Sequence, residues 1–188
     1  MDRLAVLASA NENKLRELRA ALPGWEIELL DAADYPPEEG GSYYENARAK
    51  AIFGRAAAEP GSWVLGEDSG IEIEALGGAP GLTSARWAGG EHVERALAGL
   101  KGIDARAARY VCELVAVSPE GEELRGTGVL AGRIAEEPRG SAGFGFDPVF
   151  IPEGEELTVA ELGDDWKRKN SHRARAAKAL LEAVASQT

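Results

Sequence analysis

The stretch that decides the expected fold reads EDSGIEIEALGGAPGLTSAR, from Glu67 to Arg86. An apolar run at 63–65 leads into the adjacent carboxylates of Glu67 and Asp68, and an alternating Ile-Glu-Ile-Glu run follows Gly70. Alternation of this kind is typical of a half-buried strand, so we expect both carboxylates at a strand end beside a bend at Gly70. Magnesium prefers oxygen ligands and is commonly shared between carboxylates and substrate phosphates. The stretch therefore suits a metal-nucleotide site.

A plain turn is the competing interpretation of Asp68-Ser69-Gly70, because Asp and Ser bond back to the local backbone and Gly accepts positive φ. The second half of the stretch favours a functional site over a simple turn. Gly-Gly-Ala-Pro-Gly at 77–81 is followed closely by Ser84-Ala85-Arg86. The resulting loop is longer than an ordinary hairpin loop, and its last residue is the cation Arg86.

The charge of the chain restricts its partners. The 188 residues carry a formal net charge of -11 at pH 7, which excludes a general affinity for nucleic acid or for an anionic membrane, since both need a basic face. An anionic small substrate would need a local basic patch. The block 166–181 contains no Asp or Glu and carries Lys167, Arg168, Lys169, Arg173, Arg175 and Lys178, together with His172. This block is the candidate patch, and a cationic surface helix starting at Ser171 is the alternative.

Length and cysteine content indicate one domain over residues 1–188 in a reducing compartment. The single cysteine, Cys112, lies in an apolar run at 110–115, which argues against a disulfide framework. The start at Met1 has no charged leader followed by an apolar stretch, and no window approaches the roughly eighteen apolar residues of a membrane span. We expect a cytoplasmic protein with no membrane partner.

The N-terminal third predicts a strand at 3–8, a helix at 13–22 and a second strand at 25–30 that pairs parallel to the first. The turn from Ser9 to Lys14 combines free backbone N–H groups, a helix dipole and a lysine, which is an anion site. Plain capping of the helix by Ser9, Asn11 or Asn13 remains the alternative.

The following segments leave two questions open. The loop at 31–41 carries Glu38 and Glu39, which are either surface acids or a third carboxylate for the metal. Glycines around Phe144 and Phe146 let the backbone approach a flat purine, or else lead into a core strand with both rings buried. We also predict helices at 42–58, from a capping box at Ser42, and at 91–100, with His92 at the surface, and a hairpin of strands at 109–117 and 124–134.

Several blocks in this order resemble the inosine triphosphate pyrophosphatase (Ham1-like) family, and together they span Leu4 to Ala185. They are Ser9 to Lys14, Glu45-Asn46-Ala47 with Lys50-Ala51, Asp68-Ser69-Gly70 through Ser84-Ala85-Arg86, Gly143 to Pro148, and Thr158 with Ala160-Glu161-Leu162 and Ser171-His172-Arg173. The resemblance implies an α/β fold with an elongated mixed central sheet flanked by helices and two lobes with a cleft between them, as in ITPase-like and Maf-like proteins.

The same resemblance implies a homodimeric, Mg²⁺-dependent pyrophosphatase that cleaves ITP, dITP or XTP between the α and β phosphates and so cleanses the nucleotide pool. It assigns Asp68 as the catalytic carboxylate with Glu67 beside it, and Asp68, Glu38 and Glu67 as metal ligands. The implied substrate contacts are Ser9, Ala10, Asn11, Glu12, Asn13, Lys14, Ser69, Phe144, Gly145, Phe146, Asp147, Lys167, His172 and Arg173.

Two rival functions remain open. A metal-dependent pyrophosphatase for ordinary or pyrimidine nucleotides, as in Maf-like proteins, would use the same acids. A nucleotide-sensing module would bind without cleaving, although the intact Glu67-Asp68 pair favours an enzyme. We expect a purine 6-oxo group to be selected by donors from His172, Arg173 or the backbone near Phe146, because an adenine amino group would leave such donors unpaired.

Overall fold

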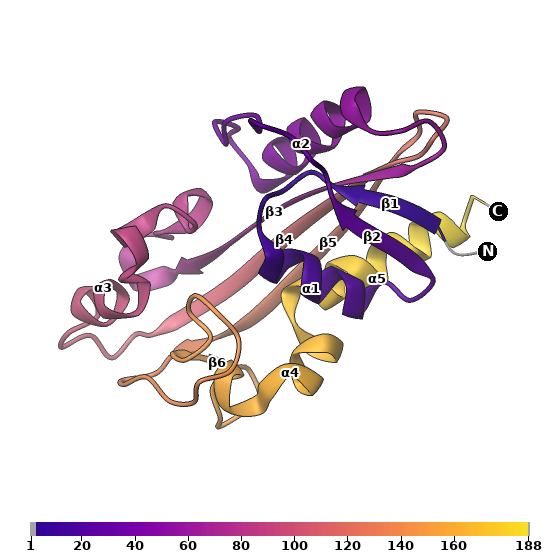
Figure 1. Cartoon of the computed structure of the whole chain (residues 1–188). Helices are drawn as coiled ribbons and strands as arrows, with labels where there is room; N and C mark the ends of the chain where they lie inside the picture. The colour runs from indigo at the N-terminus through magenta and orange to yellow at the C-terminus, as the bar shows by residue number, and fades with distance from the viewer. Residues whose placement is uncertain (1–2, 188) are drawn as a thin grey trace. The chain divides into compact units, whose positions relative to one another are not determined.

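The computed structural model describes residues 3–187, which form one six-stranded mixed sheet with flanking helices (Figure 1). The strand order is β2-β1-β3-β4-β5-β6. The elements are β1 (Arg3–Leu7), α1 (Glu12–Ala21), β2 (Trp25–Leu29), α2 (Tyr43–Ala57), β3 (Trp63–Ile73), α3 (His92–Gly99), β4 (Ala107–Val117), β5 (Glu123–Ile134), β6 (Phe150–Pro152), α4 (Val159–Asn170) and α5 (His172–Ala185), with short 3-10 turns at Glu74–Leu76, Gly81–Thr83 and Trp87–Gly90.

The pairing of the strands confirms the predicted α/β class with a mixed sheet. β1 pairs parallel with β2, as predicted, and also with β3, so that Ala5 lies opposite Ile27 on one side and Trp63 on the other. β6 runs antiparallel to β5. The predicted hairpin forms from β4 and β5, which are neighbours in the sheet and are joined by the turn at 118–122.

The chain divides into two compact units that share the three long strands. The first unit holds residues 3–68, 112–128 and 172–187, and the second holds residues 69–111 and 129–171. The expectations of a single domain over 1–188 and of a cleft between two lobes stay predictions.

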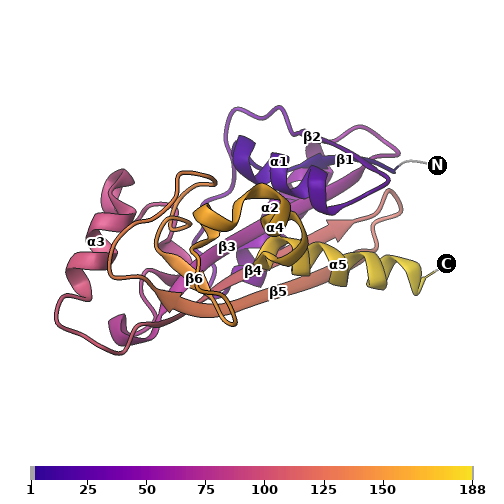
Figure 2. The ribbon, with the colours of Figure 1, turned by 90° about the horizontal axis from the view of Figure 1, so that it is seen from below.

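Helices cover both faces of the sheet in the first unit. Leucines of α1 and the apolar side of α5 pack with Cys112 and Leu114 of β4. Figure 2 shows α5 running along β5. Val115 and Val117, which point to the other face of β4, pack against Ala47 and Ala51 of α2. Cys112 is fully buried, as its apolar surroundings predict.

Glycines set how closely the helices approach the sheet in this unit. A Cβ built on Gly66 of β3 would lie 2.0 Å from the carbonyl oxygen of Ala47 in α2. A Cβ on Gly128 of β5 would lie 1.9 Å from the carbonyl oxygen of His172 at the start of α5. Both helices therefore rest with their backbone directly on a strand, and any side chain at these two positions would push them away.

The second unit has its own core, formed by one face of the sheet together with α3, α4 and β6. Ile71, Ile73, Tyr110 and Phe150 are among its large buried members. Helix α4 is absent from the predictions, although Thr158 and Glu161 form a complete capping box at its start. That Thr-x-x-Glu pattern is the sequence signal that identifies this helix.

Two local predictions are wrong. The expected bend at Gly70 does not exist, because β3 continues as a strand through Asp68, Ser69 and Gly70 to Ile73, and its place in the sheet overrides the local turn preference. His92 is not a surface residue but a half-buried one, with its ring 5.5 Å from that of Phe146.

One further prediction is correct only in part. Ser42 caps α2 by accepting a hydrogen bond from the Glu45 amide at 3.2 Å, but the Glu45 carboxylate binds the amide of Gly41 and leaves the expected capping box incomplete. No helix within residues 3–187 has both the length and the apolar content to cross a bilayer.

Replacing Gly66 by alanine should destabilise the protein by about 3 kcal/mol, because the new methyl group overlaps the α2 backbone. Gly41→Ala is the matched control, since its Cβ would meet only Glu45 Oε2 at an ordinary 3.4 Å. Urea denaturation of both variants measures the difference. Equal free energies of unfolding would contradict this account of helix docking.

Candidate active site

Asp68 lies under two polar residues of α2. Asn46 and Lys50 are four residues apart, so they face the same side of the helix, and the close approach at Gly66 brings that side onto β3. The Asn46 amide donates to Asp68 Oδ2 at 3.0 Å, and Lys50 Nζ donates to Asp68 Oδ1 at 3.3 Å. All three side chains are buried. A carboxylate held from two directions in this way has a fixed orientation.

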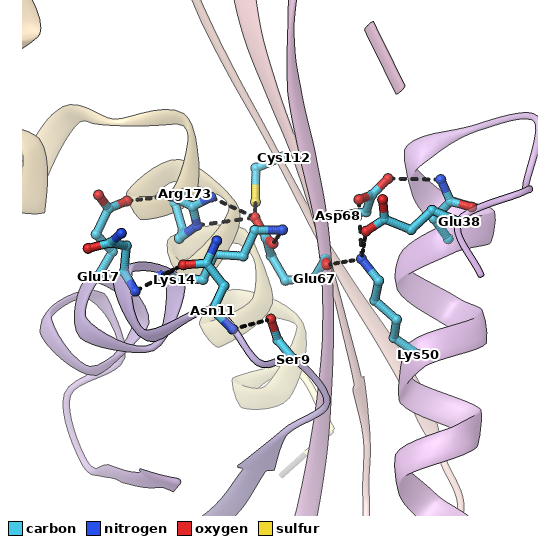
Figure 3. Close-up of polar contacts among 12 residues, drawn as sticks. Ser9, Asn11, Lys14, Glu17, Glu38, Lys50, Glu67, Asp68, Cys112 and Arg173 are labelled. Carbon is cyan, nitrogen blue, oxygen red and sulfur yellow. Dashed lines mark hydrogen bonds and ion pairs between the residues drawn. The ribbon is translucent and has the colours of Figure 1, made fainter. Parts of the chain in front are cut away.

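Lys50 joins Asp68 to the loop that precedes α2. Its Nζ lies 2.5 Å from Glu38 Oε1 and 3.1 Å from the backbone oxygen of Glu67 (Figure 3). The neighbouring Glu39 is exposed. Of the two loop acids, Glu38 is therefore the one whose carboxylate lies beside Asp68 at Lys50, and its role as a metal ligand stays a prediction.

Burial and charge act against each other on these groups. Burial raises the pKa of the Asp68 carboxyl, and the Lys50 charge and the Asn46 hydrogen bond only partly offset that effect. Burial would lower the pKa of Lys50, but the charges of Asp68 and Glu38 outweigh it and raise that pKa. Lys50 is thus held as an ammonium ion between two carboxylates.

Glu67 points to the opposite face of β3, because successive side chains of a strand alternate. Its carboxylate receives Lys14 Nζ at 2.6 Å and Arg173 Nη2 at 2.8 Å (Figure 3). Arg173 also pairs with Glu17 of α1. Burial alone would raise the pKa of Glu67, yet the Arg173 and Lys14 charges hold it well below its usual range.

The geometry of Glu67 bears on the expected metal set, which stays a prediction. Glu67 and Asp68 do not form one carboxylate pair, since each faces a different layer of helices. The Glu67 face is balanced, because two carboxylates, Glu67 and Glu17, meet two cations, Lys14 and Arg173. A divalent cation would find no excess negative charge in this group, so the arrangement does not support Glu67 as a metal ligand.

The Asp68 face does fit magnesium. Within residues 3–187 no group of three or more His, Cys, Asp and Glu side chains forms a ready-made metal site. Carboxylate oxygens of Glu38 and Asp68 nevertheless both point at Lys50 Nζ. The single positive charge of Lys50 there faces two negative charges. Magnesium commonly takes one or two carboxylates and keeps several waters, which matches this donor pair.

The turn from Ser9 to Lys14 is a capped helix start. Asn11 Oδ1 accepts from the amides of Asn13 at 3.0 Å and Lys14 at 3.2 Å, while Ser9 Oγ accepts from the amide of Asn11. Of the three capping candidates, Asn11 is the N-cap. Ala10 and Glu12 are exposed. The backbone N–H groups of Asn11, Asn13 and Lys14, which the sequence offered to phosphate, thus already have acceptors in the protein.

The second unit holds the other predicted contacts. Asp147 accepts from Lys167 Nζ at 2.6 Å and from the amide of Phe144 at 2.8 Å, and Lys167 lies 4.4 Å above the Phe144 ring. Phe146 is a core residue, only 4% exposed. Of the two rings, Phe144 is therefore the one that is accessible. Gly145 is exposed, and Ser69 follows Asp68 in β3.

Arg173 and Lys167 change the interpretation of the basic block. Both are buried, and both pair with carboxylates of the protein itself. His172, at the start of α5, is buried as well. Cations near the start of a helix need a negative charge to offset the helix dipole, and here Glu67 and Glu17 supply it to Arg173. The basic block at 166–181 is therefore not simply an exposed patch for an anionic substrate.

Sequence reasoning missed Asn46, Lys50 and Glu17 as members of the site. The first two carry a usable signal, because an Asn and a Lys at i and i+4 near the start of a predicted helix share one face. Glu17 carries none. Its partner Arg173 lies 156 residues further along the chain, so only the packing of α1 beside α5 reveals the pair.

Removing the Glu67 charge should cost about 3 kcal/mol of folding free energy, because Glu67→Gln leaves two buried cations short of a partner. Asp165→Asn is the control, since it breaks the exposed pair with Arg168 and should change stability by less than about 0.5 kcal/mol. Chemical denaturation at neutral pH compares the two variants. An equally small effect of both would show that the buried network does not stabilise the fold.

Comparison with known proteins shows the family of the chain. A sequence model described as the Ham1 family matches residues 5–183. A dITP/XTP pyrophosphatase of Leifsonia xyli subsp. xyli is 44% identical over 94% of this chain and 92% of its own length, and one of Deinococcus radiodurans is 42% identical over 96% and 92%.

Solved structures are similar over the same span. The Ham1 protein of Staphylococcus aureus matches with a TM-score of 0.84 at 30% identity, covering 99% of this chain and 100% of that one. A HAM1 protein from Coxiella burnetii gives 0.81 at 35% identity with the same coverage. Since sequence and structure agree over nearly the full length, the chain belongs to the Ham1 family.

Proposed function

We propose that this chain hydrolyses dITP, ITP and XTP at the bond between the α and β phosphates, releasing the monophosphate and pyrophosphate. Relatives above 40% identity are named dITP/XTP pyrophosphatases and are matched over nearly their whole length, which supports the same activity here. The observation that carries the proposal is the convergence of Glu38, Asp68 and Lys50. Hydrolysis of a phosphoanhydride needs such carboxylates and cations and no covalent nucleophile.

In this proposal Asp68 is the catalytic base that takes the proton of the attacking water. Its orientation by Asn46 and Lys50 supports that assignment, because a general base must be held within hydrogen-bond reach of the proton it removes. Glu38 and Asp68 would hold Mg²⁺, which supplies charge neutralisation and polarises the phosphate when bound. Lys50 keeps the two carboxylates together beforehand.

Lys14 and Arg173 are the cations that we assign to the phosphates. Glu67 contacts both, so its part is to hold them in place and not to bind metal. Glu17 supports Arg173 from α1. Cations fixed before substrate arrives need little rearrangement, which is the basis of electrostatic preorganisation.

Recognition of the base is assigned to residues of the second unit. Phe144 offers an accessible ring for stacking, and the amide of Phe144 and the ammonium of Lys167 are already ordered by Asp147. Donors of this kind suit a 6-oxo purine and leave adenine unfavoured, since its amino group cannot accept.

The family resemblance also leads us to propose a homodimer that acts in the cytoplasm. The net charge of -11 supports the absence of nucleic acid and membrane partners. A pyrimidine-directed pyrophosphatase is the second candidate function, because the metal carboxylates alone do not distinguish purine from pyrimidine.

Asp68→Asn should lower the rate of pyrophosphate release from dITP by roughly 100- to 10,000-fold, because it keeps the shape of the side chain and removes the base. Pyrophosphate is measured with Mg²⁺ and after removal of metal with EDTA. Asp165→Asn, on the exposed side of α4, should retain full activity. A fully active Asp68→Asn enzyme would refute the catalytic assignment.

Substrate choice separates the two candidate functions. We expect kcat/KM for dITP to exceed that for dATP by about 100-fold or more, since the amino group leaves donors unpaired. Turnover of dITP, dATP, dTTP and UTP under one set of conditions checks this. Faster turnover of dTTP or UTP would favour the pyrimidine-directed enzyme, and binding of dITP without cleavage would indicate a sensing module.

A further inference from the structure

Asn46 uses both ends of its amide in the site. Its Nδ2 donates to Asp68 Oδ2 at 3.0 Å, and its Oδ1 accepts from the backbone amide of Gly40 at 2.8 Å. The residue is 2% exposed, so water does not compete for either bond. The Asn46 side chain thus connects β3, which carries Asp68, to the loop at 31–41.

A glycine at position 40 allows the loop to make this contact with Asn46. A Cβ on Gly40 would lie 2.6 Å from Asn46 Oδ1 and 2.8 Å from Glu45 Cβ, so no residue other than glycine reaches the amide oxygen without displacement. Gly40 lies two residues after Glu38. The carboxylates of Glu38 and Asp68 both contact Lys50 Nζ. The position of Glu38 relative to Asp68 therefore depends on where Gly40 is held.

We propose that Asn46 is a positioning residue that sets the placement of the Glu38 loop against the catalytic carboxylate of Asp68. This inference rests on the proposed function, in which Glu38 and Asp68 together hold the metal ion. The two hydrogen bonds of Asn46 go to Asp68 Oδ2 and to the Gly40 amide. Asn46 acts through Asp68 on one side and through the Gly40 amide on the other.

The chemistry of the amide explains why Asn is suited to this position. The contact needs a donor toward the Asp68 carboxylate and an acceptor toward a backbone N–H, and a neutral carboxamide supplies both. An aspartate of the same shape supplies acceptors only, so it would keep the bond from Gly40 and place a second negative charge beside Asp68. An alanine would remove both bonds.

Glu45 provides a matched comparison from the same turn of α2. Its Oε2 accepts from the amide of Gly41 at 2.6 Å, so it ties the neighbouring loop residue to the same helix. This contact is exposed, and Glu45 makes no contact with Asp68. Glu45→Ala removes the hydrogen bond from the Gly41 amide and leaves the bonds of Asp68 unchanged.

The test compares wild type, Asn46→Asp, Asn46→Ala and Glu45→Ala in three measurements. Steady-state kinetics with dITP give kcat and KM, titration with Mn²⁺ followed by electron paramagnetic resonance gives metal affinity, and hydrogen exchange gives the protection of the Gly40 amide. Gly40→Ala is a further variant that breaks the same link from the loop side. Thermal unfolding checks that each variant is folded.

We expect Asn46→Ala to lose Gly40 protection and to weaken both kcat and Mn²⁺ affinity roughly 10- to 100-fold, with KM for dITP changed much less. Gly40→Ala should have the same effects. Asn46→Asp should retain Gly40 protection and still lose kcat, because the bond to Asp68 is lost and a second negative charge lies beside that carboxylate. Glu45→Ala should stay within about threefold of wild type in kcat and Mn²⁺ affinity, as expected of a surface contact.

Other patterns would overturn the proposal. Wild-type kcat and Mn²⁺ affinity in folded Asn46→Ala, or losses in Glu45→Ala as large as those in Asn46→Ala, would show that Asn46 has no specific part in the site. If wild type fails to cleave dITP, the proposed function fails, but Gly40 exchange and Mn²⁺ affinity still decide whether Asn46 positions the loop. Unchanged Gly40 exchange and Mn²⁺ affinity in Asn46→Ala would then refute it separately.

Discussion

Two adjacent carboxylates on a central strand are the constraint on which the first unit depends. Glu67 and Asp68 are both buried, and their side chains point to opposite faces of β3. An unpaired buried carboxylate costs several kcal/mol, so each face must supply its own cations. Helices α1 and α5 supply Lys14 and Arg173 to Glu67, and α2 supplies Lys50 to Asp68.

Small residues in the sheet make these ion pairs possible. Gly66 lets the backbone of α2 rest on β3, and Gly128 does the same for α5 on β5. The strand residue one place beyond Gly66 is Glu67, and Asp68 follows it, so the close approach and the charged pair lie side by side in the sequence. Packing distance and electrostatics are thereby fixed by the same few residues.

The cations of this protein are ordered by its own acids. Lys14, Lys50, Lys167 and Arg173 are all buried and each contacts a carboxylate. In a chain with a net charge of -11, this pairing gives each of these buried cations a fixed place beside an acid. The two faces differ in balance, because Glu67 and Glu17 match two cations, whereas Glu38 and Asp68 share one.

The sequence by itself determined the α/β class, the parallel start of the sheet, the hairpin and the family, because periodicity, capping residues and ordered motifs are local signals. It indicated Asp68 and Glu38 but did not separate Glu38 from Glu39, nor Phe144 from Phe146. Only the tertiary structure showed that the strand continues past Glu67 and Asp68, and which residues meet each of them: Glu67 through Arg173 with Glu17, and Asp68 with Asn46 and Lys50. These assignments depend on contacts between residues far apart in the chain, up to 156 positions for Glu17 and Arg173, and no local pattern encodes such contacts.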